Sequence, residues 1–124
     1  MQVERVGVVG AGQMGNGIAH VLALAEYDVL MTDISADALS AAMALIDKNM
    51  TRQVSKGAIS EAQRAIALGR IKTTPTLAAL GQTDLVIEAA TERETIKQAI
   101  FEDLLPHLKP TTILTSNTSS ISIT

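Results

Sequence analysis

The sequence contains no cysteine, which excludes disulfide bonds, zinc–thiolate sites and cysteine nucleophiles. Aromatic residues are scarce as well, since Tyr27 and Phe101 are the only two among 124 residues. Apolar residues nevertheless make up 47% of the chain, so the core must be built from Ala, Val, Ile, Leu and Met. Alanine-rich helices that pack against a sheet of β-branched residues suit an α/β layer architecture.

Long runs of one residue type are also missing. No apolar run is long enough to cross a bilayer, and we find no signal peptide ahead of the first predicted strand. The net charge is −3 and no Lys/Arg run occurs, which argues against nucleic acid or an anionic membrane as the main partner. We expect a cytoplasmic protein with no metal site, although a chain without cysteine is indifferent to the redox state of its compartment.

Hydrophobic periodicity predicts strands that alternate with helices. This alternation in a chain of one-domain length predicts a Rossmann-like α/β fold, a doubly wound parallel sheet with helices on both faces. The predicted strands are 5–9, 28–32, 71–74, 84–89 and 112–115, and the predicted helices are 13–25, 36–56, 61–69 and 92–105.

Capping residues set the bounds of the second and third helices. Ser35 is a candidate N-cap, and Gly57 supplies a stop at the other end of the same helix. Because the connection from 57 to 59 is so short, helices 36–56 and 61–69 are expected to form an antiparallel hairpin. Three methionines at helical spacing are expected in the core: Met14, Met43 and Met50.

The segment after the first predicted strand matches G-x-G-x-x-G, with the residues Gly10, Ala11, Gly12, Gln13, Met14 and Gly15. The match is weak alone, but here it joins a strand to a helix, and an acid ends the second strand, as a dinucleotide-binding fingerprint requires. Its glycines allow a tight turn, close approach of a pyrophosphate and close helix–sheet packing. The helix N-terminus adds about half a positive charge. The alternative is a turn with packing duties only.

Asp33 is the acid at the end of the second predicted strand. A carboxylate there accepts hydrogen bonds from the adenosine ribose and repels a 2′-phosphate, and Ile34 and Ser35 supply no arginine to hold one. The position therefore favours NAD over NADP. The alternative is an ordinary acid at the entry to a helix.

Two polar segments follow later predicted strands, where ligands bind in open α/β sheets. One runs from Ile87 to Lys97, and the other is Ser116-Asn117-Thr118-Ser119-Ser120. Together with the glycine loop and Asp33, they resemble the 3-hydroxyacyl-CoA dehydrogenase family, and within it the bacterial 3-hydroxybutyryl-CoA type, over essentially the whole chain.

The resemblance implies hydride transfer between NAD and a substrate, an L-3-hydroxyacyl-CoA that becomes a 3-ketoacyl-CoA or the reverse. It places Glu92 and Lys97 near the nicotinamide ribose, Asn117 beside the nicotinamide and Ser119 on the substrate's 3-oxygen. The alternatives stay open. Glu92 and Lys97 could be a first-turn acid and a solvated base, and Asn117 and Ser119 could cap a loop.

The resemblance also implies contacts to coenzyme A from Lys56 and, with less support, from Asn49. A cation suits the phosphates of the coenzyme. Lys56 is equally well explained as a favourable charge at a helix C-terminus.

One departure from the family pattern is large. The family's general base is a histidine paired with a glutamate beyond the Asn117 segment, and neither His20 nor His107 occupies its place. We therefore expect residues 1–124 to be a partial NAD-binding domain that is inactive alone and leaves the last strand as a bare sheet edge. The helical domain for the acyl pocket and a homodimer interface would be missing. The alternatives are another hydroxyacid or sugar-acid dehydrogenase, or a non-catalytic NAD sensor.

Overall fold

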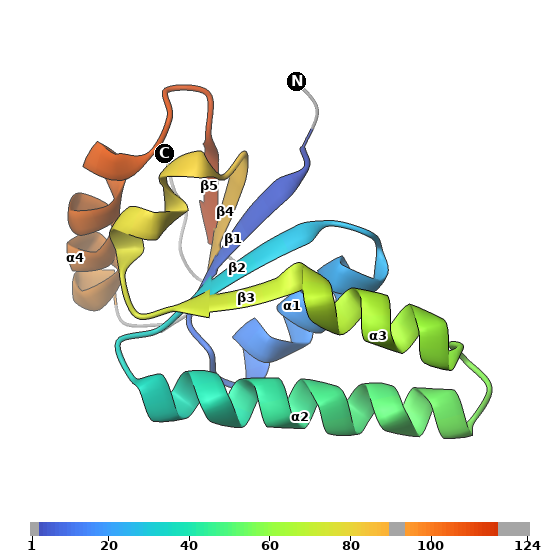
Figure 1. The fold of residues 1–124 in the computed structure, drawn as a ribbon. Coiled ribbons are helices and arrows are strands. Elements are labelled where there is room, and N and C mark those ends of the chain that lie inside the picture. The colour runs from blue at the N-terminus through green and yellow to red at the C-terminus, as the bar shows by residue number, and fades with distance from the viewer. Residues whose placement is uncertain (1–2, 90–93, 117–124) are drawn as a thin grey trace.

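The computed structural model describes residues 3–89 and 94–116 (Figure 1). Its sheet has the order β3-β2-β1-β4-β5, and every described pair of strands is parallel. This confirms the predicted doubly wound sheet. The strands are β1 (Arg5–Val9), β2 (Asp28–Thr32), β3 (Ile71–Thr74), β4 (Leu85–Glu88) and β5 (Ile113–Ser116).

Helices cover both faces of the sheet. One face carries α1 (Gln13–Leu24), α2 (Ala36–Ser55) and α3 (Glu61–Arg70), and the other carries α4 (Glu94–Leu104) (Figure 1). Two short 3₁₀ helices, η1 (Leu77–Gln82) and η2 (Leu105–His107), lie on the α4 side. None of the helices in the described ranges combines the length and apolar character needed to span a bilayer.

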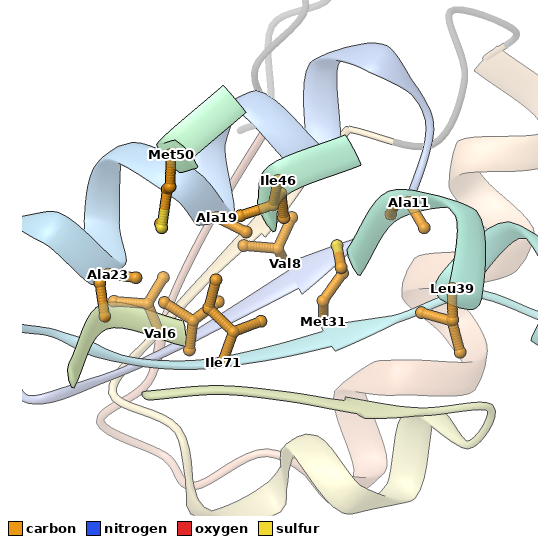
Figure 2. Packing of buried hydrophobic residues seen from close by; sticks show 13 residues of the cluster. Val6, Val8, Ala11, Ala19, Ala23, Met31, Leu39, Ile46, Met50 and Ile71 are labelled. Carbon is orange, nitrogen blue, oxygen red and sulfur yellow. The ribbon is translucent and has the colours of Figure 1, made fainter. Parts of the chain in front are cut away.

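Burial is unequal on the two faces. Among the described residues, the larger cluster has thirteen buried members from β1, β2, β3, the loop after β1 and helices α1 to α3, and Figure 2 shows Ala19 and Ile46 beside Val8 in it. Under α4, the described residues form a cluster of four buried side chains, namely Val9, Leu80, Val86 and Leu104. The small residues Ala19 and Ala23 of α1 share this cluster with valines of β1 and β2, in agreement with the expectation that alanine-rich helices pack against the sheet.

The predicted helical hairpin is present, with α2 and α3 antiparallel (Figure 1). Gly57, just beyond the helix end, has a φ of 77°, a conformation that favours glycine. The Ser60 side chain caps α3 and accepts from the Gln63 N–H, while the Gln63 side chain accepts from the Ser60 N–H. These local signals fix the turn of the hairpin.

One prediction about burial was wrong. Met14 is 41% exposed at the start of α1, so it is not a core residue, whereas Met50 is fully buried. Leu105 is 54% exposed because α4 ends at Leu104 and the chain continues into η2.

Candidate cofactor-binding site

The glycine loop lies at the carboxyl ends of β1 and β4, where the strand order of the sheet reverses (Figure 1). Ligands of open α/β sheets bind in this crevice. Gly10 has a φ of 108°, a backbone conformation that residues other than glycine rarely adopt. Its N–H donates a hydrogen bond to the Thr32 carbonyl at 2.7 Å. The loop therefore turns sharply away from β1 and is held to the end of β2.

Gly15 and Gly12 meet different surroundings. A Cβ at Gly15 would lie 1.8 Å from the Gly10 carbonyl oxygen, so only glycine lets α1 approach the loop this closely. A Cβ at Gly12 would have nothing within 4 Å, and Gly12 is exposed. The space beside Gly12 is open to a ligand, as the pyrophosphate of a dinucleotide requires.

The first turn of α1 offers amide N–H groups with no competing side chain. Gly12 is the N-cap and has no side chain to cap the helix, and the first turn holds no acidic residue. Gln13 and Met14 are exposed there. Because the helix N-terminus carries partial positive charge, these residues fit an anionic pyrophosphate.

Asp33 is half-buried at the end of β2 and accepts two backbone hydrogen bonds. Its Oδ2 accepts from the Ala11 N–H at 3.0 Å, and its Oδ1 accepts from the Ser35 N–H at 2.9 Å. The Ser35 hydroxyl in turn accepts from the Ala38 N–H and caps α2. Asp33 thus ties the glycine loop to the start of α2. Each carboxylate oxygen can accept a further bond, so the ribose hydroxyls of NAD can be accommodated.

Ile34 follows Asp33 and is 95% exposed, the highest value among the exposed large apolar residues described. An apolar side chain held in solvent beside a nucleotide site offers a surface for a flat base. In the sequence, Ile34 indicated only that no arginine follows Asp33. The signal that could have identified it is an isoleucine placed between a strand-ending acid and an N-cap serine.

Glu88 is a second acid at this end of the sheet. It is fully buried at the end of β4 and lies opposite Val9 in the register of the sheet. No role was predicted for Glu88 itself, although the sequence shows that it is an acid at the end of an apolar strand.

The remaining predicted residues are only partly placed. Lys97 lies in α4, whereas Glu92, Asn117 and Ser119 lie outside the described residues. β5 ends at Ser116, so the segment of Asn117 follows a carboxyl end of the sheet as predicted.

The proposed coenzyme A contacts lie far from the glycine loop. Lys56 is the exposed C-cap residue of α2, and Asn49 is half-buried in the same helix. Helix α2 begins near Asp33 and runs for about 30 Å at 1.5 Å per residue, so Lys56 lies at its distant end. The structure does not bring Lys56 together with Asp33 and the loop.

The two histidines lie away from the loop. The His20 Nε2 is 2.7 Å from the Gln53 Oε1, a contact that joins α1 to α2. His107 is exposed in η2, ahead of the amino end of β5. Within the described ranges, no group of three or more His, Asp or Glu residues could hold a metal ion.

Residues 5–124 match the family model described as "3-hydroxyacyl-CoA dehydrogenase, NAD binding domain". The chain belongs to the 3-hydroxyacyl-CoA dehydrogenase family. It is 53% identical over 122 residues to a 3-hydroxybutyryl-CoA dehydrogenase of Bradyrhizobium diazoefficiens, covering 98% of this chain and 42% of that protein. It is 43% identical over 124 residues to a 3-hydroxyadipyl-CoA dehydrogenase of Escherichia coli, covering 100% of this chain and 26% of that protein.

The fold agrees with that of solved members of the family. The crystal structure of an (S)-3-hydroxybutyryl-CoA dehydrogenase from Ralstonia eutropha superposes with a TM-score of 0.95 at 42% identity, covering 98% of this chain and 43% of that one. The chain is the NAD-binding domain of this family. It spans less than half the length of these relatives.

Proposed function

We propose that this chain is the cofactor-binding part of an enzyme that interconverts L-3-hydroxyacyl-CoA and 3-ketoacyl-CoA. The observation that carries the proposal is the hydrogen bond between Ala11 and Asp33, which unites a phosphate-binding loop and a ribose-binding acid in a chain of this family. When bound, NAD would supply the hydride acceptor or donor for this reaction. The residues of the chain bind and orient it: the first turn of α1 holds the pyrophosphate and Asp33 holds the adenosine ribose.

The substrate is proposed to be a short-chain 3-hydroxyacyl-CoA such as 3-hydroxybutyryl-CoA. The support is the name of the Bradyrhizobium relative, which is 53% identical, against 43% for the relative named for 3-hydroxyadipyl-CoA. Steady-state rates of the enzyme with the two acyl-CoA substrates, compared as kcat/KM, test this choice. A preference for the adipyl substrate would contradict it.

Four residues after β4 and β5 are proposed to complete the site. Glu92 and Lys97 would contact the nicotinamide ribose side, and Asn117 would lie beside the nicotinamide. Ser119 would donate a hydrogen bond to the substrate's 3-oxygen as the carbonyl forms. The support is the family resemblance and the position of these segments after carboxyl ends of the sheet.

Lys56 and Asn49 are proposed to contact coenzyme A. Lys56 is exposed and makes no side-chain hydrogen bond or ion pair with any described residue, so its charge is available to a phosphate. A contact at the distant end of α2 requires the coenzyme to lie along the helical hairpin rather than at the glycine loop. Lys56→Gln would then raise KM for the acyl-CoA and leave NADH affinity unchanged.

We propose that residues 1–124 are only part of the enzyme and are inactive alone. The family's general-base histidine lies beyond the Asn117 segment, and general-base catalysis contributes about 10²–10⁴-fold. A helical domain is proposed to complete the acyl pocket and to form the homodimer. The chain would bind NADH but would not oxidise it with acetoacetyl-CoA. A normal rate from these residues alone would contradict this part of the proposal.

The test of the cofactor site is a calorimetric titration of the chain with NADH and with NADPH. We expect NADH to bind and NADPH to bind more weakly, because the Asp33 carboxylate repels a 2′-phosphate. In Asp33→Ala the loss of the bonds to Ala11 and Ser35 weakens both cofactors alike. The ratio of the NADPH dissociation constant to the NADH dissociation constant therefore reports only on the contact between residue 33 and the ribose. In Asp33→Ala this ratio should move toward one.

Gly12→Ala is the matched variant for the pyrophosphate. Its Cβ meets nothing within 4 Å in the chain itself, so the fold should be kept. The methyl group would occupy the space proposed for the pyrophosphate, and NADH affinity should fall by roughly tenfold or more, the equivalent of one lost charge-assisted hydrogen bond. Native affinity in this variant would show that the cofactor does not approach Gly12.

Ile34 is proposed to cover one face of the adenine ring. Replacement by serine removes an apolar side chain that is 95% exposed, so the free energy of unfolding should change by less than about 0.5 kcal/mol. Affinity for NADH should fall roughly fivefold, while affinity for nicotinamide mononucleotide, which lacks adenine, should be unchanged. Equal losses for both ligands would place Ile34 outside the adenine contact.

A further inference from the structure

A cavity of about 330 Å³ opens at the amino ends of β1, β2 and β3. The glycine loop lies at the other ends of these strands, their carboxyl ends. Its volume falls in the lower part of the range of small-ligand sites. None of the residues assigned above to NAD or coenzyme A lines it.

The cavity exists because the crossover from β3 to β4 is short. A full helix would cover β2 and β3 on this face, but the chain forms only η1 there. Gly7 of β1 has no side chain, and the Leu80 Cδ2 fills the space at 2.8 Å from where a Cβ would lie. Helix η1 therefore packs over β1, and its residues Ala79 and Gln82 form one wall of the cavity.

The register of the sheet places charged residues together on this face. At the amino ends of the strands, Arg5 of β1 pairs with Asp28 of β2, which forms a first row of neighbours across the sheet. Two residues further along, Gly7, Leu30 and Lys72 are neighbours across β1, β2 and β3 and form a second row. Residues two apart in a strand share a face, so both rows line the same side of the sheet. Because Gly7 adds no side chain, Leu30 forms the apolar floor of the cavity between the charged residues.

Two of the cations in the cavity have no side-chain partner among the described residues. The Arg70 Nη1 donates to the Glu26 carbonyl at 3.1 Å and to the Asp28 Oδ1 at 3.4 Å, so Asp28 is already paired. The side chains of Arg5 and Lys72 make no hydrogen bond or ion pair with any residue in the described part of the chain. The described lining of the cavity thus holds three cations, Arg5, Arg70 and Lys72, and one carboxylate, Asp28, an excess of two positive charges beside an apolar floor.

We propose that this cavity is a second ligand site, which binds a small phosphate monoester. The phosphate would be held by Arg5 and Lys72, and the organic group would lie against Leu30 and Ala79. The charge argues for a monoester, because such a phosphate carries about −1.5 to −2 at neutral pH and matches two free cations. A monocarboxylate would leave one of them unpaired.

The site is separate from the cofactor site. Arg5 and Gly10 lie at opposite ends of β1, roughly 16 Å apart at about 3.3 Å per residue. This exceeds the Debye length of about 8 Å at physiological salt. Occupation of one site should therefore leave the other accessible.

The probe for the test is phenyl phosphate, titrated into ¹⁵N-labelled chain and followed by amide chemical shifts. We expect saturable shifts at Leu30, Lys72 and Gln82, with saturating NADH present or absent. The double variant Arg5→Gln/Lys72→Gln should bind the probe at least roughly tenfold more weakly, since each charged hydrogen bond contributes about that much. Lys48→Gln, an exposed cation on α2, is the control and should bind it as the native chain does.

Three results would overturn the proposal. Shifts confined to residues 10–15 would show that the probe binds only the glycine loop. Unchanged affinity in the double variant would remove the role of the two cations. If inorganic phosphate bound as tightly as phenyl phosphate, the apolar floor would play no part. If benzoate bound as tightly, the double charge would play no part. Because the shifts are read residue by residue, a failure of NADH to bind would not affect the outcome.

Discussion

Gly15 and Gly17 stand two positions apart in α1 and differ in what surrounds them. A Cβ at Gly15 would lie 1.8 Å from the Gly10 carbonyl oxygen, a backbone atom that cannot turn aside. Gly15→Ala must push α1 from the loop, and we expect the free energy of unfolding to fall by about 3 kcal/mol, the upper end for overpacking. Urea denaturation measures this loss, and NADH affinity should fall with it.

Gly17→Ala is the matched control, because a Cβ at Gly17 meets nothing within 4 Å. Alanine in a helix interior is favoured over glycine by about 0.5–1 kcal/mol, so this variant should be more stable than the native chain. If Gly15→Ala unfolds at the native urea concentration, the close approach of α1 to the loop is wrong.

The sequence predicted the residues of the loop and Asp33, but not how they are joined. The dinucleotide-binding pattern includes an acid after the second strand. Because β2 pairs in parallel with β1, its carboxyl end lies near the loop that follows β1. The bond from the Ala11 N–H to the Asp33 Oδ2 depends on the side-chain rotamer, and the exposure of Ile34 depends on the entry to α2. Both are set by tertiary geometry, which a single sequence does not encode locally.

At the scale of elements, Asp84 joins three segments of the chain. Its Oδ1 accepts from the Lys109 Nζ at 2.8 Å, ahead of β5, and its Oδ2 accepts from the N–H groups of Glu4 and Arg5 at the start of β1. These bonds, with that of Lys109 the strongest, hold the pKa of Asp84 well below its usual range. The amino ends of β1 and β4 are thus held by one carboxylate.

The lowered pKa of Asp84 makes the stability of the chain depend on pH. A carboxyl whose folded pKa is depressed stabilises the fold above its unfolded pKa of about 3.9, and this contribution is lost as the pH falls further. Asp84→Asn should therefore be less stable than the native chain at pH 7, and the difference should shrink from pH 4 downward. Urea midpoints between pH 2.5 and pH 7 measure it.

Asp37→Asn is the control for this series. Asp37 is exposed in the first turn of α2, and its side chain has no hydrogen bond with any described residue. Its replacement should lower the urea midpoint slightly, through the helix dipole alone. A difference between Asp84→Asn and the native chain that stays constant down to pH 2.5 would contradict the assigned role.

Strong local signals explain which elements the sequence predicted. The helices with a serine cap and a glycine stop begin and end within one residue of the predicted bounds. The 3₁₀ helices η1 and η2 were not predicted, because three to six residues are too few to show a period. Pro106 in η2 cannot continue an α-helix, and this turns Leu105 off the buried face of α4.

At the scale of the whole molecule, the two faces of the sheet differ in their described cores. Among the residues whose burial the structure describes, thirteen lie in the cluster of the α1–α3 face and four lie in the cluster under α4. Regions with few buried contacts open at lower free energy than the rest of a domain. Strand β5 also lies at one edge of the described sheet, where it pairs with β4. We infer that α4 and β5 form a weaker unit whose opening leaves β1, β2 and α2 folded.

Two truncations, Ile46→Ala and Leu104→Ala, test this inference by amide hydrogen exchange. Both side chains are fully buried, so each variant should lose about 2–5 kcal/mol of global stability. Ile46→Ala should speed exchange in β2 but leave residues 98–104 of α4 unchanged, because α4 opens without breaking the contacts of Ile46. Leu104→Ala should speed exchange in β2 and in residues 98–104, because it removes a contact that is lost both when α4 opens and when the whole domain unfolds. If Ile46→Ala speeds exchange in α4 as much as in β2, the domain unfolds as one unit and the difference between its faces has no thermodynamic consequence.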